Sequence, residues 1–244
     1  MKLLLLILLT FYGAGCSQIN YQNSVQFVLE NAVINKFDGI IVYVDKVEES
    51  KHYSAGWKNK EDKIPSDPYS LFKIASISKL YIAAATAKII HEGSLSLDKT
   101  LAEYLPDING RIENAEIITL RMMLQHRSGI PNFTDEEFGY PWGETPKSTW
   151  KTLELVLDMP ADFKPNKKYE YSNTNYLLIG EILDRILGYS HHDYVKEEIL
   201  IPLELNNTYS LLSEINLDDL TSGYHIGWDM DVKQNDYIIP GGSM

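Results

Sequence analysis

The stretch SLFKIASISKLYIAAATAKIIHEG, residues 70–93, predicts a long helix. Ser76 suits a helix N-terminus, the interior is rich in alanine, and Gly93 suits a helix stop. We therefore expect a helix over residues 76–93. The stretch also contains the tetrapeptide Ser-x-x-Lys twice, so either serine is a candidate nucleophile.

Ser-x-x-Lys is a weak signal by itself, because about one match is expected by chance in a chain of this length and composition. The matches are Ser70/Lys73, Ser76/Lys79, Ser96/Lys99 and Ser148/Lys151. The first pair precedes the predicted helix in an extended segment, the third follows its glycine stop in a polar loop, and the fourth begins an exposed helix. Only Ser76/Lys79 is expected on the first turn of a long apolar helix.

The position of Ser76 and Lys79 suits nucleophilic chemistry. Residues three apart on a helix share a face, so the hydroxyl and the amine can meet. The helix N-terminus favours negative charge on the serine oxygen, and a buried lysine can lose its proton and act as a base. The tetrapeptide alone leaves an alternative open, in which Ser76 only caps the helix and Lys79 is exposed.

A second proton shuttle is available in YEYSNTNY, residues 169–176. A tyrosine such as Tyr171 can relay a proton beside a lysine, and an amide such as Asn173 can bind a substrate amide. Tyr-x-Asn is also a common pattern, since Tyr21-Gln22-Asn23 matches it. The enzymatic hypothesis requires the Ser76 hydroxyl, the Lys79 amine and the Tyr171 phenol to share a dry pocket.

Composition and motifs exclude several classes of function. The chain has 244 residues, a net charge of −12 and a pI of about 4.9, so it repels phosphate backbones and we expect no nucleic-acid partner. There is no Gly-x-Ser-x-Gly, no dinucleotide or P-loop motif and no His-Glu-x-x-His. We therefore expect no cofactor and no metal, and we expect the adjacent His191 and His192 to be exposed.

The N-terminus, MKLLLLILLTFYGAGCSQIN, predicts export. Residues 1–15 have the lysine, the apolar run and the small residues of a secretory signal. Cys16, the only cysteine, is placed as in a bacterial lipoprotein signal, so we expect it to be lipidated and to anchor the protein in the bacterial cell envelope. The alternative is a plain secreted protein. Residues 16–36 are expected to form a tether and a helix.

The remaining pattern predicts an α+β fold with an antiparallel sheet and a helical region. Two strands are expected to pair across a charged turn, and three further helices follow. The predicted strands span residues 37–45 and 51–57, and the predicted helices span residues 118–126, 172–188 (with a serine or asparagine cap and Gly188 as the stop) and 193–205 (broken by Pro202).

Five ordered blocks in this chain resemble the serine β-lactamase and D-alanyl-D-alanine peptidase family, most of all its class C β-lactamase and esterase branch. They are LFKIASISKLYIAAA, LSLDKTLAEYLPDI, ITLRMMLQHRSGIPNF, FKPNKKYEYSNTNYLLIGEIL and IPLELNNTYS. The resemblance implies a β-lactamase/transpeptidase-like domain over residues 37–244.

The resemblance also implies roles for single residues. Ser76 corresponds to the acylated serine, Lys79 to its helix partner, Tyr171 to the general base and Asn173 to the ligand of the substrate amide. The block containing His126 is taken as structural. The implied substrate is a D-amino-acid peptide, a β-lactam or an ester.

The chain departs from the family pattern at several points. Asn166 and Glu204 stand where glycine is usual, and Arg127 replaces a common threonine. The third family motif, Lys or His followed by Thr or Ser and Gly, is not found. We therefore expect the C-terminal strands to be missing, so that the chain is a fragment or a truncated protein. A rival hypothesis is a non-catalytic envelope lipoprotein that keeps part of the fold for binding.

Overall fold

The computed structural model describes residues 24–35, 37–46, 49–139, 148–225 and 232–233. The chain divides into two compact units, residues 1–69 and 70–244, which are described separately. The predicted signal, Cys16 and most of the predicted tether lie outside the described residues.

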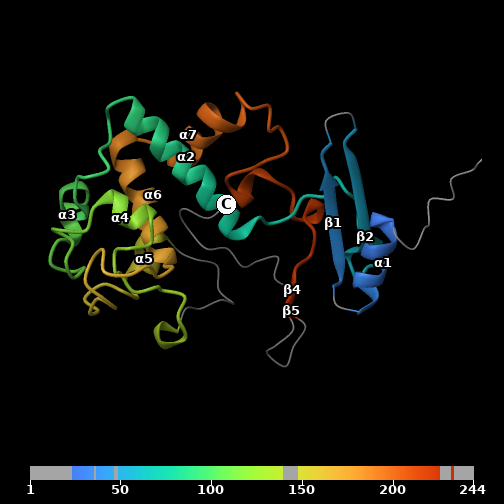
Figure 1. Ribbon diagram of the computed structural model, residues 1–244, viewed down its shortest axis with the longest axis horizontal. Coiled ribbons are helices and arrows are strands. Elements are labelled where there is room, and N and C mark those ends of the chain that lie inside the picture. The colour runs from blue at the N-terminus through green and yellow to red at the C-terminus, as the bar shows by residue number, and fades with distance from the viewer. Residues whose placement is uncertain (1–23, 36, 47–48, 140–147, 226–231, 234–244) are drawn as a thin grey trace, which may run out of the picture. The chain divides into compact units, whose positions relative to one another are not determined.

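The first unit contains a helix and an antiparallel sheet (Figure 1). The order β1–β2–β3 places the longest strand in the centre. The bounds are α1 Val25–Asn35, β1 Gly39–Val44, β2 Lys51–Asn59 and β3 Ile64–Pro65. Both predicted strands and their antiparallel pairing are confirmed, and the two-residue β3 was not predicted.

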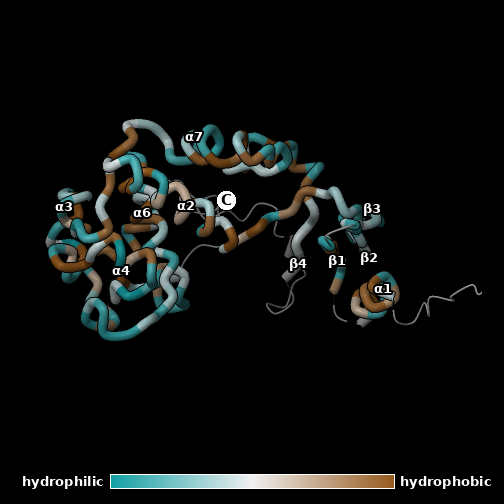
Figure 2. The backbone as a smooth tube through the Cα atoms, turned by 45° about the horizontal axis from the view of Figure 1, so that its top comes forward, coloured by the Kyte–Doolittle hydropathy of each residue, from teal (hydrophilic) through white to brown (hydrophobic). Residues whose placement is uncertain are grey.

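Helix α1 packs against β2. It is mostly hydrophobic (Figure 2), and Leu29 is its buried residue. Gln26 Nε2 donates a hydrogen bond to the Ser54 carbonyl of β2 at 3.1 Å. The helix therefore closes one face of a sheet that has few strands among the described residues, which matters because a small sheet alone is marginally stable.

The second unit is mainly helical. Its elements are η2 Ala75–Ile77, α2 Ser78–His91, α3 Leu101–Tyr104, η3 Pro106–Ile108, α4 Leu120–Leu124, η4 Glu136–Phe138, α5 Thr149–Leu153, α6 Asn173–Leu187, α7 His191–Val195, η5 Lys196–Leu200, η6 Leu212–Glu214, η7 Leu217–Asp219, β4 Tyr224–His225 and β5 Val232–Lys233.

The predicted helices of this unit are found with different ends. Helix α6 matches its prediction within a residue at each end, and Gly188 terminates it with a φ of 76°. The long predicted helix begins as α2 at Ser78, because Ser76 lies in the preceding 3₁₀ turn. The helix expected over 193–205 and broken by Pro202 is found in part. Helix α7 continues into the π-helix η5, which was not predicted, and helical structure ends before Pro202, as predicted.

The core of the second unit lies between α2, α4 and α6, and α2 and α6 pack side by side in Figure 1. Each helix contributes side chains without solvent exposure, among them Ile82, Met123 and Leu178. Burying one such side chain contributes about 1.5–3 kcal/mol. This packing holds the start of α2 and the start of α6 in fixed positions.

The expected α+β arrangement is confirmed among the described residues: helices together with an antiparallel sheet. Within the described parts of the chain, the helices are all too short or too polar to cross a membrane.

Candidate active site

Ser76, Lys79, Tyr171 and Asn173 are joined by four hydrogen bonds. The Ser76 hydroxyl and the Tyr171 hydroxyl are 2.7 Å apart, and Lys79 Nζ donates to Ser76 Oγ at 3.3 Å. Lys79 Nζ also donates to Asn173 Oδ1 at 2.9 Å, and the Tyr171 hydroxyl donates to the same oxygen at 3.2 Å. These four residues therefore form one polar cluster, in which Ser76 and Tyr171 are 95 positions apart in the sequence.

A strained turn presents Ser76. Ala75 has a φ of 46°, a left-handed conformation that costs an L-residue about 1–2 kcal/mol. Ala75 is the first residue of the 3₁₀ turn η2, which carries Ser76 at the surface, and α2 then places Lys79 three residues later. The Lys79 side chain is 7% exposed, so the expected burial of its amine is confirmed.

The start of α6 supplies the other two side chains. Tyr171 precedes the helix, and Asn173 is its first residue. Ser172 occupies the predicted cap position, but its hydroxyl donates to the Pro131 carbonyl at 3.3 Å and makes no capping bond. Asn132 Oδ1 accepts the first helical N–H, from Asn173, at 2.9 Å instead.

The loop from His126 to Thr134 is joined to this helix start by further hydrogen bonds. His126 Nδ1 accepts from the Ser172 N–H at 3.2 Å, and Thr174 Oγ1 donates to the Pro131 carbonyl at 2.6 Å. Ser128 Oγ donates to Asn175 Oδ1 at 2.6 Å. These contacts give the block around His126 a physical function, which is to fix the position of Tyr171 and Asn173.

Aromatic rings surround the Lys79 amine. Lys79 Nζ lies 5.4 Å from the ring centre of Tyr171 and 5.5 Å from that of Tyr176, within cation–π range. The His126 ring lies 4.5 Å from the Tyr171 ring. Burial, and then the positive charge of Lys79, lower the pKa of His126, while burial raises the pKa of Tyr176. A neutral His126 adds no second positive charge beside Lys79.

The expected dry pocket is only partly found. The Lys79 amine is buried, but Ser76 is exposed and Tyr171 is 39% exposed among the described residues. The cluster therefore has a dry base and an open face.

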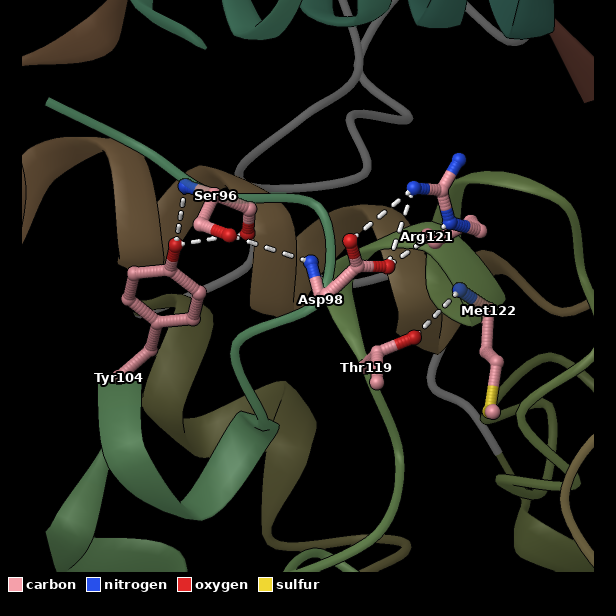
Figure 3. A network of polar contacts seen from close by, with 6 residues as sticks. All are labelled: Ser96, Asp98, Tyr104, Thr119, Arg121 and Met122. Carbon is pink, nitrogen blue, oxygen red and sulfur yellow. Dashed lines mark hydrogen bonds and ion pairs between the residues drawn. The ribbon is translucent and has the colours of Figure 1, made fainter. Parts of the chain in front are cut away.

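Two of the other Ser-x-x-Lys serines, Ser96 and Ser148, have local structural partners. Ser96 lies in a loop network with Tyr104, Asp98 and Arg121 (Figure 3): its N–H donates to the Tyr104 hydroxyl at 2.7 Å, and its hydroxyl accepts from the Asp98 N–H. Ser148 caps α5 by accepting from the Lys151 N–H. Ser70 lies in the extended segment before α2, as expected.

The expectation that both histidines at 191 and 192 are exposed is wrong. His191 is 3% exposed and its Nδ1 lies 2.7 Å from Asp184 Oδ1, while His192 Nδ1 lies 2.7 Å from the Ser210 hydroxyl. Tertiary packing of α7 on α2 and α6 buries His191 and covers His192 in part, which adjacency in sequence does not indicate. Across the part of the chain that the structure describes, no three His, Cys, Asp or Glu side chains are arranged to hold a metal ion.

The fold and the cluster define a class: an α+β protein with a serine, a lysine and a tyrosine gathered at a helix start. The particular family follows from comparison with known proteins. A sequence profile described as Beta-lactamase matches residues 32–241, so the chain belongs to this family. The family includes serine hydrolases such as amidases, peptidases and esterases.

Individual relatives are similar over most of this chain. It is 25% identical over 212 residues to a penicillin-binding protein of Bacillus subtilis (strain 168), covering 84% of this chain and 45% of that protein. The crystal structure of D-amino acid amidase from Ochrobactrum anthropi SV3 with L-phenylalanine amide superposes with a TM-score of 0.76 at 25% sequence identity. This match covers 90% of the present chain and 62% of the amidase chain. The octameric penicillin-binding protein homologue from Pyrococcus abyssi superposes with a TM-score of 0.72 at 28% sequence identity. This match covers 88% of the present chain and 51% of the homologue. The chain therefore spans less than half of that curated relative.

Sequence reasoning did not assign the residues that support Asn173. Asn132 and Thr134 stand 41 and 39 positions before it and contact its amide. Asn132 falls in one of the five family-like blocks, which is the only signal that the sequence offered for it.

Proposed function

We propose that this protein is a serine hydrolase that cleaves an amide, a β-lactam or an ester through an acyl-serine intermediate. The observation that supports the proposal most is that the Ser76 hydroxyl lies within hydrogen-bond distance of both the Tyr171 hydroxyl and the Lys79 amine. A nucleophile next to two groups that exchange protons is the arrangement that acyl transfer requires.

The proposed reaction has two steps. Ser76 Oγ attacks the substrate carbonyl carbon and gives its proton to the pair formed by Lys79 and Tyr171. The bond from the carbonyl carbon to the leaving nitrogen or oxygen breaks, and that atom takes a proton from the pair. A water molecule then attacks the acyl carbon, which releases the acid and returns a proton to Ser76 Oγ. The start of α2 favours negative charge at the attacked carbonyl oxygen.

The substrate class is proposed from the relatives. One similar structure is a D-amino acid amidase and two relatives are named for penicillin binding. An amide, a strained cyclic amide and an ester all present a carbonyl carbon with a leaving group, so one site can acylate on each. We propose D-amino-acid amides and peptides, β-lactams and esters as the panel to test.

Trapping with a labelled penicillin and with a fluorophosphonate tests the proposal. The unmodified chain is expected to bind one label per molecule, and Ser76→Ala is expected to bind none. Ser70→Ala is the matched control, because it removes the other serine of the same tetrapeptide, and it is expected to label fully. Equal labelling of Ser76→Ala and the unmodified chain would reject the role of Ser76.

Export and lipid anchoring at Cys16 are also proposed, supported by the pattern of residues 1–20. Growth of expressing bacteria with an alkyne-tagged fatty acid is expected to label the protein. Cys16→Ser is expected to abolish the label and leave the penicillin reaction unchanged. A protein that stays unlabelled in a bacterium with active lipoprotein processing would contradict the anchor.

A further inference from the structure

Two side chains of the loop after Pro131 hold the amide of Asn173. Asn173 Nδ2 donates to Asn132 Oδ1 at 3.2 Å and to Thr134 Oγ1 at 3.2 Å. A primary amide has two N–H donors, so both are engaged by this loop. The remaining atom of the amide, Oδ1, faces Lys79 and Tyr171.

The orientation of the Asn132 amide is fixed by partners that have only one possible role. The Asn173 backbone N–H can only donate, and it lies 2.9 Å from the atom assigned as Asn132 Oδ1. On the other side, Asn132 Nδ2 donates to Asp135 Oδ1 at 2.7 Å, and the oxygen of a carboxylate accepts. Both ends of the Asn132 amide are therefore assigned by hydrogen bonding.

This assignment determines the orientation of Asn173. Because Asn132 presents an oxygen, the Asn173 atom that faces it must be the nitrogen. A flipped Asn173 would place two oxygens against each other at this contact and would direct its N–H groups at the Lys79 amine. Both contacts would be repulsive, so the loop selects one of the two amide orientations.

We propose that Asn132 is a positioning residue for the Ser76 site, an inference that rests on the function proposed above. Asn132 holds Asn173 Oδ1 toward Lys79 and Tyr171. The Tyr171 hydroxyl has one hydrogen, which it donates to Asn173 Oδ1, and Lys79 Nζ donates to Ser76 Oγ. The Ser76 hydroxyl hydrogen is then directed at the Tyr171 oxygen, so the network fixes the direction of the Ser76 hydroxyl, beside the pair that takes its proton, before attack.

Three variants separate this role from a general loss of stability. Asn132→Asp keeps the acceptor for Asn173 but places a carboxylate beside Asp135. The double variant Asn132→Asp with Asp135→Asn keeps the acceptor and restores the bond between positions 132 and 135 with donor and acceptor exchanged. Asn132→Ala removes both the acceptor for Asn173 and the donor to Asp135. Asn207→Ala, an exposed asparagine of the same unit, is the matched control.

The first readout is the second-order rate constant of acylation by a fluorophosphonate. Asn132→Ala and Asn132→Asp are expected to slow it roughly 10- to 100-fold, the range for misplaced catalytic groups. The double variant is expected to recover to within about threefold of the unmodified chain, and Asn207→Ala is expected to be unchanged. A double variant as slow as Asn132→Asp overturns the proposal, as does an Asn132→Ala variant that labels at the original rate.

The second readout does not depend on activity. In ¹⁵N-labelled protein the two side-chain amide protons of Asn173 are expected to exchange slowly with water, and to exchange fast in Asn132→Ala. Fast exchange in the unmodified chain overturns the proposal. If the unmodified chain is not acylated at all, the proposed function fails and this measurement still decides the positioning. If Asn132→Ala does not fold, the comparison of Asn132→Asp with the double variant decides it.

Discussion

Gly129 is the residue where backbone conformation constrains the candidate site most tightly. Its φ is +80°, and a Cβ atom at this position would lie 2.0 Å from the Phe163 carbonyl oxygen. Gly129 accepts from the Asp162 N–H at its own carbonyl and follows Ser128, which bonds to α6. A side chain here must move the loop that holds the start of α6.

Gly129→Ala is expected to reduce the free energy of unfolding by roughly 2–4 kcal/mol, the sum of left-handed strain and overpacking. Gly110→Ala is the control, because Gly110 has the same φ of +80° with no atom within 4 Å of the added Cβ. It is expected to cost about 1 kcal/mol. Urea denaturation measures both, and equal losses would show that the clash with Phe163 has no effect.

His192 makes stability depend on pH. Burial, and then the charge of His191, lower its pKa from 6.5 to about 4, while Asp184 and Glu214 act in the opposite direction. Between these two values the unfolded chain binds more protons than the folded chain, so stability falls as the pH falls. This contribution is fully present above pH 6.5 and is lost toward pH 4.

Lowering the pH from 7 to 5 is expected to remove about 2 kcal/mol through His192. His192→Gln is expected to flatten the dependence, with a remaining slope from His126, whose pKa is also lowered. Unfolding free energies measured at several pH values test this. An unchanged slope in His192→Gln would assign the pH dependence to other groups.

At the scale of elements, two positions where the family pattern has glycine carry other residues in the left-handed conformation. Asn166 has a φ of 64° and Glu204 a φ of 55°. Asparagine tolerates this conformation, and Asn166 Oδ1 also accepts from Arg127 Nε at 2.9 Å. Glu204 follows the π-helix η5, and glutamate does not share the tolerance of asparagine for the left-handed conformation.

Glu204→Gly is expected to stabilise the protein by about 0.5–1 kcal/mol, since relief of left-handed strain exceeds the added entropy of the unfolded chain. Asn166→Gly is expected to give no gain, because it also removes the hydrogen bond to Arg127. Thermal melts of both variants measure the difference. A Glu204→Gly variant that melts at or below the original temperature contradicts this account of the turn.

The sequence predicted what depends on local residues. The stop of α6 follows from Gly188, and the positions of Asn166 and Glu204 in left-handed turns follow from a family pattern that has glycine there. The start of α6 was placed correctly, although its first N–H is bound by the distant Asn132 and not by the predicted cap. The π-helix after α7 and the burial of His191 were not predicted, because both depend on how α7 packs against α2 and α6.

At the scale of the whole molecule, long-range contacts complete the candidate site. Ser76 and Lys79 were predictable as neighbours on one turn, but their contacts with Tyr171 and Asn173 span more than 90 residues. Only the family resemblance brought these four residues together before the structure. The support from Asn132 needed the fold, because a hydrogen bond between two asparagine side chains has no sequence signature.

Mapping the acylated residue tests the central claim most directly. Trypsin cleaves after Lys73 and Lys79, so Ser76 falls in the peptide of residues 74–79 and Ser70 in a different one. After reaction with a fluorophosphonate, tandem mass spectrometry is expected to place a single adduct on Ser76. An adduct on Ser70, on Ser78 or on any residue outside this peptide would contradict the account.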